Sequence, residues 1–408
     1  MTRIVFRVSG EGEAVGSSGG AVGRAWVATC VLYLVSFAAA LGAATALVTL
    51  TGHSVGETLL ALYEGSLHGG ASIGQTIDEA TPLLLVATGA IICARAGIFN
   101  IGQEGQLLIG AMAGAAIGLF LSSPVPGADP ALGSGAGSGL SVGFSAGSGL
   151  SVGSGTGWVV LVLVLGGAAL AGAVWAGIPA LLFYWRGVDV VISTLLLVFV
   201  AVQLVSFAVN RDYLLQETAV KGQILSQQSD ALPEGVRLPR LGEYPDFTIG
   251  TGVFVALALT VVVAVLLRYG RWGFRLRMLG LNRVAAHRAG VRAAALGGGA
   301  LLLSGGFAGL AGGVMLTGTV FRIQPGLSDN VGWEGLLVAL VARNHPLAAV
   351  PVAVFFGALR AGGGFLASTG VPRYLVSVVT ALLVLAAVFP AAYAEARGRR
   401  RRMTVWGR

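Results

Sequence analysis

The stretch GIFNIGQEGQLLIGA, residues 97–111, decides how this chain folds, because it places polar side chains where a long apolar run begins. These polar side chains are Asn100, Gln103, Glu104 and Gln106. A carboxylate facing lipid costs a few kcal/mol at the centre of a bilayer. If the run crosses a membrane, Glu104 must therefore face a cavity or the interior of a helix bundle.

The composition places the chain in a membrane. Apolar residues make up 55% of its 408 residues and charged residues only 11%, against about 25% in ordinary soluble domains. The mean hydropathy is +0.83. The 64 glycines, many of them beside alanine within apolar runs, favour helices that pack closely. We predict an all-α polytopic membrane protein with one transmembrane domain over residues 25–392.

Ten apolar runs are candidates for transmembrane helices, at the roughly 20 residues that a bilayer core requires. They are residues 25–50, 74–94, 98–121, 157–183, 188–210, 249–267, 294–320, 333–343, 346–361 and 373–390. The runs 333–343 and 346–361 are too short to cross alone and are interpreted as half-helices. The chain then crosses ten times, or eight times if this short pair forms one re-entrant hairpin.

The distribution of charge predicts the orientation. Residues 268–293 hold seven arginines and no acid, and the tail 393–408 holds six more arginines, so both should be cytoplasmic. Residues 211–249 hold six acids against four basic residues and are placed outside. The N-terminal tail, residues 1–24, is then cytoplasmic as well. We expect a multi-pass protein of a bacterial cell membrane, whose basic C-terminal tail contacts anionic lipids.

The sequence contains two internal repeats. AGSGLSVG occurs at 136–143 and again at 146–153, within the low-complexity segment 122–156, which predicts a flexible external loop. The second repeat is weaker: GQEGQL at 102–107 is echoed by GWEGLL at 332–337. Many transporters consist of two related halves whose ligand site lies at corresponding discontinuous helices. The echo is consistent with two such halves.

The polar residues at the start of these two repeats have two interpretations. Asn100 followed by Gln103 has the spacing of a capping box, so the group could cap a helix near the membrane surface. It could also line a solute pathway, since polar residues within membrane spans are usually functional. Glu334 has the same two interpretations, with the cap favoured. The candidate pathway residues are Asn100, Gln103, Glu104, Gln106 and Glu334.

Several kinds of chemistry are excluded. A phosphate-binding loop requires G-x-x-x-x-G-K-[ST], and the chain's single lysine, Lys221, lies in AVKGQ, so the chain is not an ATPase. Cys30 and Cys93 are interpreted as small core residues, and the four histidines lack metal-ligand spacing. We predict no metal, no cofactor in this chain and no covalent catalysis. Basic residues do not alternate with aromatic ones, so no nucleic acid is expected.

Four segments resemble, in order, the motifs of membrane permease subunits of ABC importers. They are the opening stretch, GLNRVAAHRAGV at 280–291, SGGFAGLAGG at 304–313 and GWEGLLVALVARNHPL at 332–347. The likeness covers residues 75–392 except the insert 122–156. It points to the group of ribose, branched-chain amino acid and nucleoside systems, and most to the nucleoside (basic membrane protein-associated) permeases.

This resemblance implies a subunit that forms the translocation pathway for a small polar solute, with a nucleoside expected. ATP and Mg²⁺ would be bound by separate ATPase subunits. A second permease subunit, identical or homologous, and an extracytoplasmic solute-binding lipoprotein would complete the importer. One departure bears on the solute: where the family has Glu and Asn, this chain has Val190 and Val198. If those groups contact substrate elsewhere in the family, the site here is more apolar.

The arginine-rich loop, residues 268–293, is the expected contact for the ATPase. Its candidate residues are Arg277, Gly280, Asn282, Ala285, Ala286, Ala289 and Gly290. The alternative is a basic loop that fixes topology without a partner. For the whole chain, the alternatives are an ion-coupled secondary transporter with Glu104, Glu334 and His345 as proton carriers, a sugar or amino acid ABC permease, and a membrane protein without transport.

Overall fold

The computed structural model describes residues 55–122 and 157–368, apart from residue 212 and the stretches 219–225 and 243–246. It also describes scattered helical positions within 31–49 and 378–390. The two tails, the insert from residue 123 onward and most of the runs 25–50 and 373–390 therefore lie outside the described residues. Their predicted roles, and the count of ten or eight crossings, stay predictions.

Seven of the described helices are long and apolar enough to cross a membrane, which confirms the all-α polytopic fold. They are α3 (Gly70–Arg95), α4 (Gln103–Ser122), α5 (Gly157–Arg186), α6 (Val190–Val209), α7 (Gly252–Tyr269), α10 (Ala293–Met315, continued by the π-helical turn η3, Leu316–Val320) and α12 (Pro346–Ser368). Shorter elements connect or flank them: α2 (Val55–Ser66), η2 (Glu234–Val236), α8 (Arg271–Leu281), α9 (Arg283–Arg288), α11 (Val331–Val341) and the antiparallel pair β1 (Arg240–Leu241) and β2 (Ile249–Gly250).

The run 346–361 was predicted to be too short to cross, and this was wrong. The helix α12 has 23 residues and continues to Ser368. Its last turns contain Arg360 and the glycines 362–364, which lower the local hydropathy but pack closely, with Gly362 against the backbone of Leu62 in α2. The run 333–343 is confirmed as a short helix, since α11 has only 11 residues.

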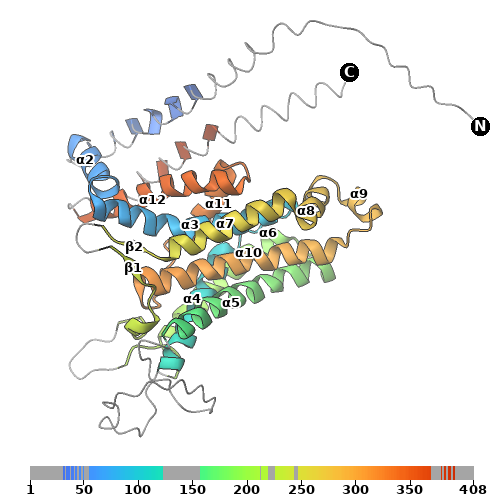
Figure 1. The fold of residues 1–408 in the computed structure, drawn as a ribbon, viewed down its shortest axis with the longest axis horizontal. Coiled ribbons are helices and arrows are strands. Elements are labelled where there is room, and N and C mark those ends of the chain that lie inside the picture. Colours follow the sequence, from blue (N-terminus) through green and yellow to red (C-terminus); the bar gives the residue numbers. More distant parts are fainter. Residues whose placement is uncertain are drawn as a thin grey trace, which may run out of the picture.

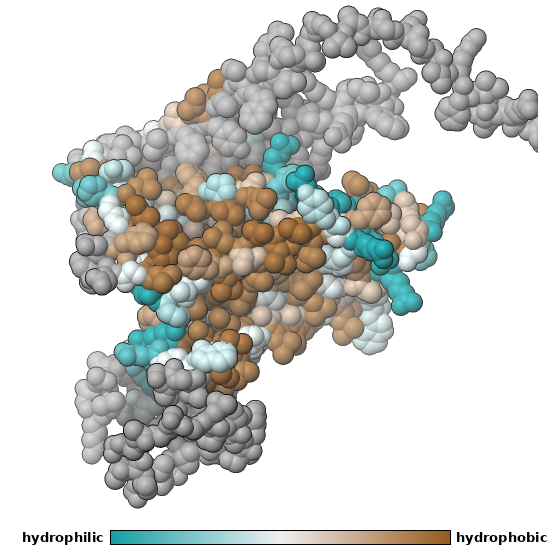
Figure 2. All heavy atoms as spheres, viewed as in Figure 1, coloured by the Kyte–Doolittle hydropathy of each residue, from teal (hydrophilic) through white to brown (hydrophobic). Residues whose placement is uncertain are grey.

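The bundle has two chemically different ends (Figure 1). The helices α8 and α9, with their arginines, lie at one end, here called the arginine end. The elements η2, β1 and β2 lie at the other, here called the hairpin end. Figure 2 shows a broad apolar surface between polar groups at both ends, as expected for a protein embedded in a bilayer. The arginine-rich loop and the described part of the acidic loop are thus on opposite sides of the apolar band.

Two non-helical segments interrupt the bundle from opposite ends. At the arginine end, residues 96–102 leave α3 and return into the bundle before α4 begins. At the hairpin end, residues 321–330 leave η3 and return into the bundle before α11 begins. Gln103 marks the depth of the first segment: its Nε2 donates to the carbonyl of Val86 over 3.0 Å. Val86 lies nine residues before Arg95, about 14 Å along the axis of α3.

Each copy of the GxEGxL echo thus starts a helix inside the bundle. Gly102–Leu107 begins α4, which runs toward the hairpin end, and Gly332–Leu337 begins α11, which runs toward the arginine end. The two starts meet, because the backbone amide of Gly332 bonds to the carboxylate of Glu104. This arrangement supports the interpretation of two related halves with opposite directions.

Small residues allow the central helices to approach closely. In α10, Gly305 and Gly309 pack against the backbone of Gly172 in α5, and Gly309 also faces Gly110 in α4. A side chain at these contacts would overlap the facing backbone, so glycine is required there. The close approach holds α4, α5 and α10 in fixed register. The segments 96–102 and 321–330 are then the irregular part of the bundle.

Candidate functional site

Glu104 lies where the segments 96–102 and 321–330 meet. Its side chain is buried, with 6% of the residue exposed. One carboxylate oxygen accepts a hydrogen bond of 2.7 Å from the amide of Gly332, and the other accepts one from the hydroxyl of Ser328. Free N–H groups at a helix start attract negative charge. Glu104 therefore caps α11 from the neighbouring helix and ties α4 to the segment 321–330.

The three amide side chains form a second group next to Glu104. Asn100 and Gln106 exchange hydrogen bonds of 2.8 and 3.1 Å, and Asn100 and Gln103 both donate to the hydroxyl of Ser304 in α10, over 3.0 and 3.1 Å. All three are at most 2% exposed. Within the described part of the chain, the Oε1 atom of Gln103 has no hydrogen-bond partner. The group joins the start of α4 to α3 and α10.

The capping interpretations need correction. Asn100 does accept a bond from the amide of Gly102 over 3.1 Å, but Gln103 turns to α3 and α10, so the reciprocal capping box is absent. Glu334 does not cap α11; its carboxylate binds Arg360 instead. Gln103 donates to acceptors in α3 and α10, and Glu334 accepts from Arg360, so in both cases tertiary partners replace the local backbone. The pathway role of these five residues stays a prediction.

Arg360, in α12, binds residues of α3, of the segment 321–330 and of α11. Its Nε donates to Glu79 over 2.9 Å, Nη1 to the carboxylate of Glu334 over 3.1 Å and to the carbonyl of Asp329 over 2.9 Å, and Nη2 to the carboxylate of Asp329 over 3.2 Å. Its side chain is only 11% exposed. The guanidinium holds α3, the segment 321–330 and α11 to α12, which makes it the centre of the charged network.

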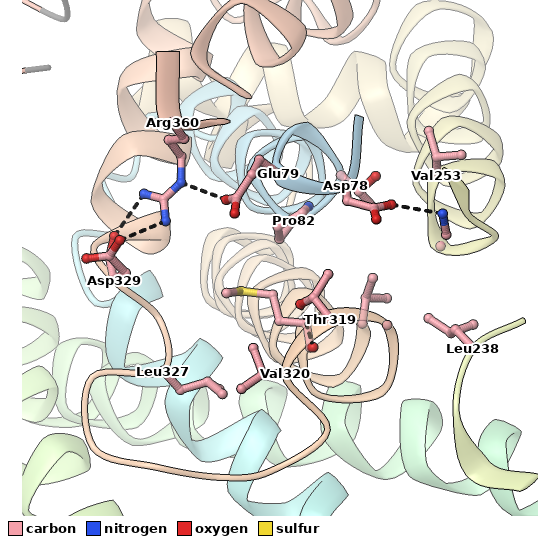
Figure 3. A pocket seen from close by; sticks show the side chains of 16 residues that line it. Asp78, Glu79, Pro82, Leu238, Val253, Thr319, Val320, Leu327, Asp329 and Arg360 are labelled. Carbon is pink, nitrogen blue, oxygen red and sulfur yellow. Dashed lines mark hydrogen bonds and ion pairs between the residues drawn. The ribbon is translucent and has the colours of Figure 1, made fainter. Parts of the chain in front are cut away.

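A cavity of about 210 Å³ opens beside this network at the hairpin end (Figure 3). Its wall is built from α3, α7, the end of α10, the segment 321–330 and α12. The polar lining residues are Asp78, Glu79, Thr81, Thr319, Asp329 and Arg360, and the apolar ones include Pro82, Leu238, Val314 and Leu327. The volume is below the roughly 300–1,000 Å³ typical of drug-sized ligand pockets. It is large enough for a small solute only.

Asp78 fixes the opposite wall of the cavity. Its Oδ1 accepts a bond of 2.9 Å from the amide of Gly250 in β2, and its Oδ2 lies 3.7 Å from the guanidinium of Arg240 in β1. Arg240 also donates to the carbonyl of Gly318 over 3.0 Å. The acidic residue thus anchors the β-hairpin over the ends of α3 and α10.

The sequence interpretation missed Asp78, Glu79, Asp329 and Arg360. A signal was present: Asp78, Glu79 and Arg360 are charged residues inside apolar runs, and such residues are functional by default. They were overlooked because no local motif links them, since Glu79 and Arg360 are separated by 281 residues. Of the predicted pathway residues, Glu334 joins this network through Arg360, while Asn100, Gln103, Glu104 and Gln106 lie deeper in the bundle.

The predicted coupling segment forms two short helices, α8 and α9, at the arginine end. Asn282 caps α9, because its Oδ1 accepts bonds of 3.0 Å from the amides of Val284 and Ala285. Arg277 donates to the carbonyl of Leu267 over 2.6 Å and ties α8 to α7. Gly280 packs against the carbonyl of Arg95 and the amide of Gly97, so the end of α8 touches the start of the segment 96–102.

The remaining coupling candidates, in and next to α9, differ in their exposure to solvent. Ala286 is fully buried, whereas Ala285, Ala289 and Gly290 are exposed. The apolar residues Leu281 and Val284 are also exposed, at 88% and 64%. Gly290 has a φ of 78°, which a residue with a side chain rarely adopts, and ends the short helix. An exposed apolar edge between arginines is suited to a protein partner, and no described residue covers it.

The described residues hold no group of three or more His, Cys, Asp or Glu that could bind a metal ion. Cys93 is buried in α3 and donates to the carbonyl of Ala300 over 3.3 Å. The arrangement consists of closely packed helices, two non-helical segments that meet at Glu104 and a polar cavity beside the segment 321–330.

Comparisons with known proteins agree with this architecture. The model of the family described as "Branched-chain amino acid transport system / permease component" matches residues 72–388. The guanosine ABC transporter permease protein NupP of Bacillus subtilis is 28% identical over 86% of this chain and 91% of its own length. The glucose ABC transporter permease protein TsgB13 of Haloferax volcanii is 30% identical over 88% and 87%.

The nucleoside ABC transporter permease protein NupB of Lactococcus lactis is 25% identical over 79% of this chain and 80% of its own length. No solved structure matches the chain significantly. The family match covers most of the chain, including every described helix from α4 to α12, and confirms the resemblance drawn from the motifs. The chain is a multi-pass ABC transporter permease and belongs to the family of branched-chain amino acid transport system permease components.

Proposed function

We propose that this chain forms the translocation pathway of an ABC importer for nucleosides. The observation that carries the proposal is the similarity, over most of the chain, to permease proteins named for guanosine and nucleosides. The importer would contain this chain, a second permease subunit, a pair of ATPase subunits that bind ATP and Mg²⁺, and an extracytoplasmic solute-binding lipoprotein. The similarity to two Bacillus permease proteins, NupP and NupQ, favours a homologous second permease.

In this proposal the arginine end faces the cytoplasm and the hairpin end faces outside. Basic loops stay on the cytoplasmic side, and the arginines of α8 and α9 are separated from the acidic loop by the apolar band (Figure 2). The N- and C-terminal tails are cytoplasmic, and the C-terminal arginines contact anionic lipids. The cavity beside Arg360 then opens toward the solute-binding protein.

The ATPase acts on the pathway through α8 and α9. Closure of the ATPase pair would push the exposed edge of α9, around Val284 and Ala285. The push passes to the segment 96–102 through the contact of Gly280 with Gly97, which leaves no room for a side chain. That segment leads directly to Asn100, Gln103 and Glu104, and so to α11. A short series of close contacts therefore connects the exposed edge of α9 with the segments 96–102 and 321–330.

Uptake of labelled solutes tests the substrate. We expect cells with the complete importer to take up guanosine, to lose this uptake when the gene for this chain is deleted, and to keep it when a protonophore collapses the proton gradient while ATP is maintained. Uptake that follows the proton gradient and ignores ATP would instead favour an ion-coupled transporter.

Glucose is the second candidate solute, because TsgB13 is 30% identical and covers a similar share of the chain. The same cells distinguish the two: competition of labelled guanosine by unlabelled glucose, or glucose uptake that depends on this chain, would reassign the solute. A leucine competitor serves as the control for amino acid systems.

A pair of alanines tests the coupling surface. Ala285 is exposed on α9, so Ala285→Trp should prevent co-purification of the ATPase while the chain still inserts and melts normally. Ala286 is fully buried, so Ala286→Trp should lower the melting temperature first. Undiminished ATPase binding and uptake in the Ala285→Trp importer would remove α9 as the docking element.

A further inference from the structure

The cavity at the hairpin end carries more negative than positive charge. Four carboxylates line it or bind to its lining residues, and only two guanidinium groups face them. The carboxylates are those of Asp78, Glu79, Asp329 and Glu334, and the guanidinium groups are those of Arg240 and Arg360. The formal excess is two negative charges. Because the surrounding helices are apolar, this charge is screened less than it would be on an open surface.

Most hydrogen-bond donors of Arg360 and of the two lining threonines are already used. The guanidinium of Arg360 makes four hydrogen bonds with its five N–H groups, all of them to Glu79, Asp329 and Glu334. The hydroxyls of Thr81 and Thr319 donate to carbonyls of their own helices, over 2.8 and 2.9 Å. What remains available to a solute on this side of the cavity is one N–H of Arg360 and several carboxylate, hydroxyl and carbonyl oxygens, so acceptors outnumber donors.

A cavity of acceptors with excess negative charge suits one chemical class of solute. Sugar hydroxyls and amino groups donate hydrogen bonds to carboxylates, whereas a phosphate ester offers only acceptors and negative charge. We propose that this cavity selects solutes by charge, admitting uncharged or cationic molecules rich in hydroxyl or amino groups and excluding phosphorylated ones. The proposal rests on the proposed function, since it describes what the pathway accepts.

Charged thiol reagents test the electrostatic part without any transport. Thr319 lines the cavity and is exposed, so a Thr319→Cys chain, with Cys30 and Cys93 replaced by alanine, places one thiol there. Its rates of modification by a cationic trimethylammonium and an anionic sulfonate methanethiosulfonate are divided by those of 2-mercaptoethanol. We expect the corrected cation-to-anion ratio to be about tenfold or more, because a cleft of one sign concentrates counter-ions.

Two neutralising variants and a control assign this ratio to the cavity. Glu79→Gln and Asp329→Asn, made singly in the Thr319→Cys chain, should each lower the ratio severalfold. Glu234→Gln makes the same change of charge at the hairpin end but outside the cavity wall, and should leave the ratio unchanged. A corrected ratio near unity, or one that ignores Glu79→Gln and Asp329→Asn, overturns the proposal.

Protection by solutes tests the choice of ligand. Millimolar guanosine or glucose should slow modification of the Thr319→Cys chain, and guanosine 5′-monophosphate at equal concentration and ionic strength should not. Protection by the monophosphate, or by none of the three, contradicts the proposal. These outcomes are separable from the proposed function: an importer that takes up guanosine but shows no charge preference at Thr319→Cys retains its function and loses this selectivity mechanism.

Discussion

Glu104 and the carboxylates around Arg360 all lie among membrane-spanning helices, yet their surroundings differ. Glu104 is buried, and its two oxygens bond to Ser328 and to Gly332, which lie on either side of the start of α11. Around Arg360, several carboxylates share one guanidinium, and the side chain of Asp329 is 77% exposed. Glu104 connects α4 to α11 by hydrogen bonds, while the carboxylates around Arg360 leave hydrogen-bond acceptors facing a cavity.

The difference separates two uses of a charge inside a membrane protein. A carboxylate whose acceptors are satisfied by a helix start stabilises a fixed junction. Where carboxylates outnumber the guanidinium groups that face them, some carboxylate oxygens stay available to a solute. Substitution of Glu104 should therefore lower both the amount of folded protein and the transport per protein. The Arg360 network should lose stability only when its cation is removed.

The largest effect is expected for Arg360→Gln. The change leaves the carboxylates of Glu79, Asp329 and Glu334 close together without a cation, and removing one partner of a buried ion pair costs about 3–5 kcal/mol. We expect a large fall in the amount of folded protein, measured by fluorescence-detected size-exclusion chromatography. Arg360→Lys keeps the charge but loses the several simultaneous bonds, so its loss should be partial. Equal stability of Arg360→Gln and wild type would show that the network is not structural.

Sequence alone predicted more of the Glu104 junction than of the Arg360 network, for a physical reason. Asn100, Gln103, Glu104 and Gln106 lie within seven residues, so a local pattern revealed them, and the echo even pointed to Gly332. Their partners, Ser304, Ser328 and the carbonyl of Val86, depend on helix packing that no local pattern contains.

The helices themselves were largely predictable, because apolar runs of about 20 residues have few alternatives in a membrane. The end of α12 was missed because Arg360 and the glycines 362–364 interrupt its hydropathy, although tertiary pairing and close packing keep that segment helical. The network's charges were visible one by one, but only the fold shows that α3, α11 and α12 bring them together.

Glu104→Ala should have the next largest effect. The change leaves the amide of Gly332 and the hydroxyl of Ser328 buried without an acceptor, at about 1–3 kcal/mol for each unsatisfied group. We expect uptake, divided by the amount of protein in the membrane, to fall further than the amount itself. Glu104→Gln keeps one acceptor and should lie between. Proportional losses of uptake and protein would mean that Glu104 is purely structural.

Gly332→Ala tests the same junction by steric overlap and changes no charge. A methyl group at Gly332 overlaps the backbone of Glu104, so α4 and α11 must separate, at a cost of about 1–3 kcal/mol for such overpacking. The matched control is Gly299→Ala in α10, where a methyl group meets nothing within 4 Å. The control should be neutral or slightly more stable, since alanine favours a helix. Thermal unfolding of both variants in detergent makes the comparison.

The smallest effect on stability is expected for Glu79→Gln. This variant distinguishes the Glu104 junction from the Arg360 network most clearly. Its carboxylate is 33% exposed, and Arg360 keeps Asp329 and Glu334 after the change. An ion pair this accessible contributes about 0–1 kcal/mol, so the melting temperature should move little. The cavity nevertheless loses one negative charge, and its preference for cationic reagents should fall. If Glu79→Gln unfolds the protein as strongly as Glu104→Ala, the Arg360 network is a structural joint of the same kind, and the distinction between the two regions fails.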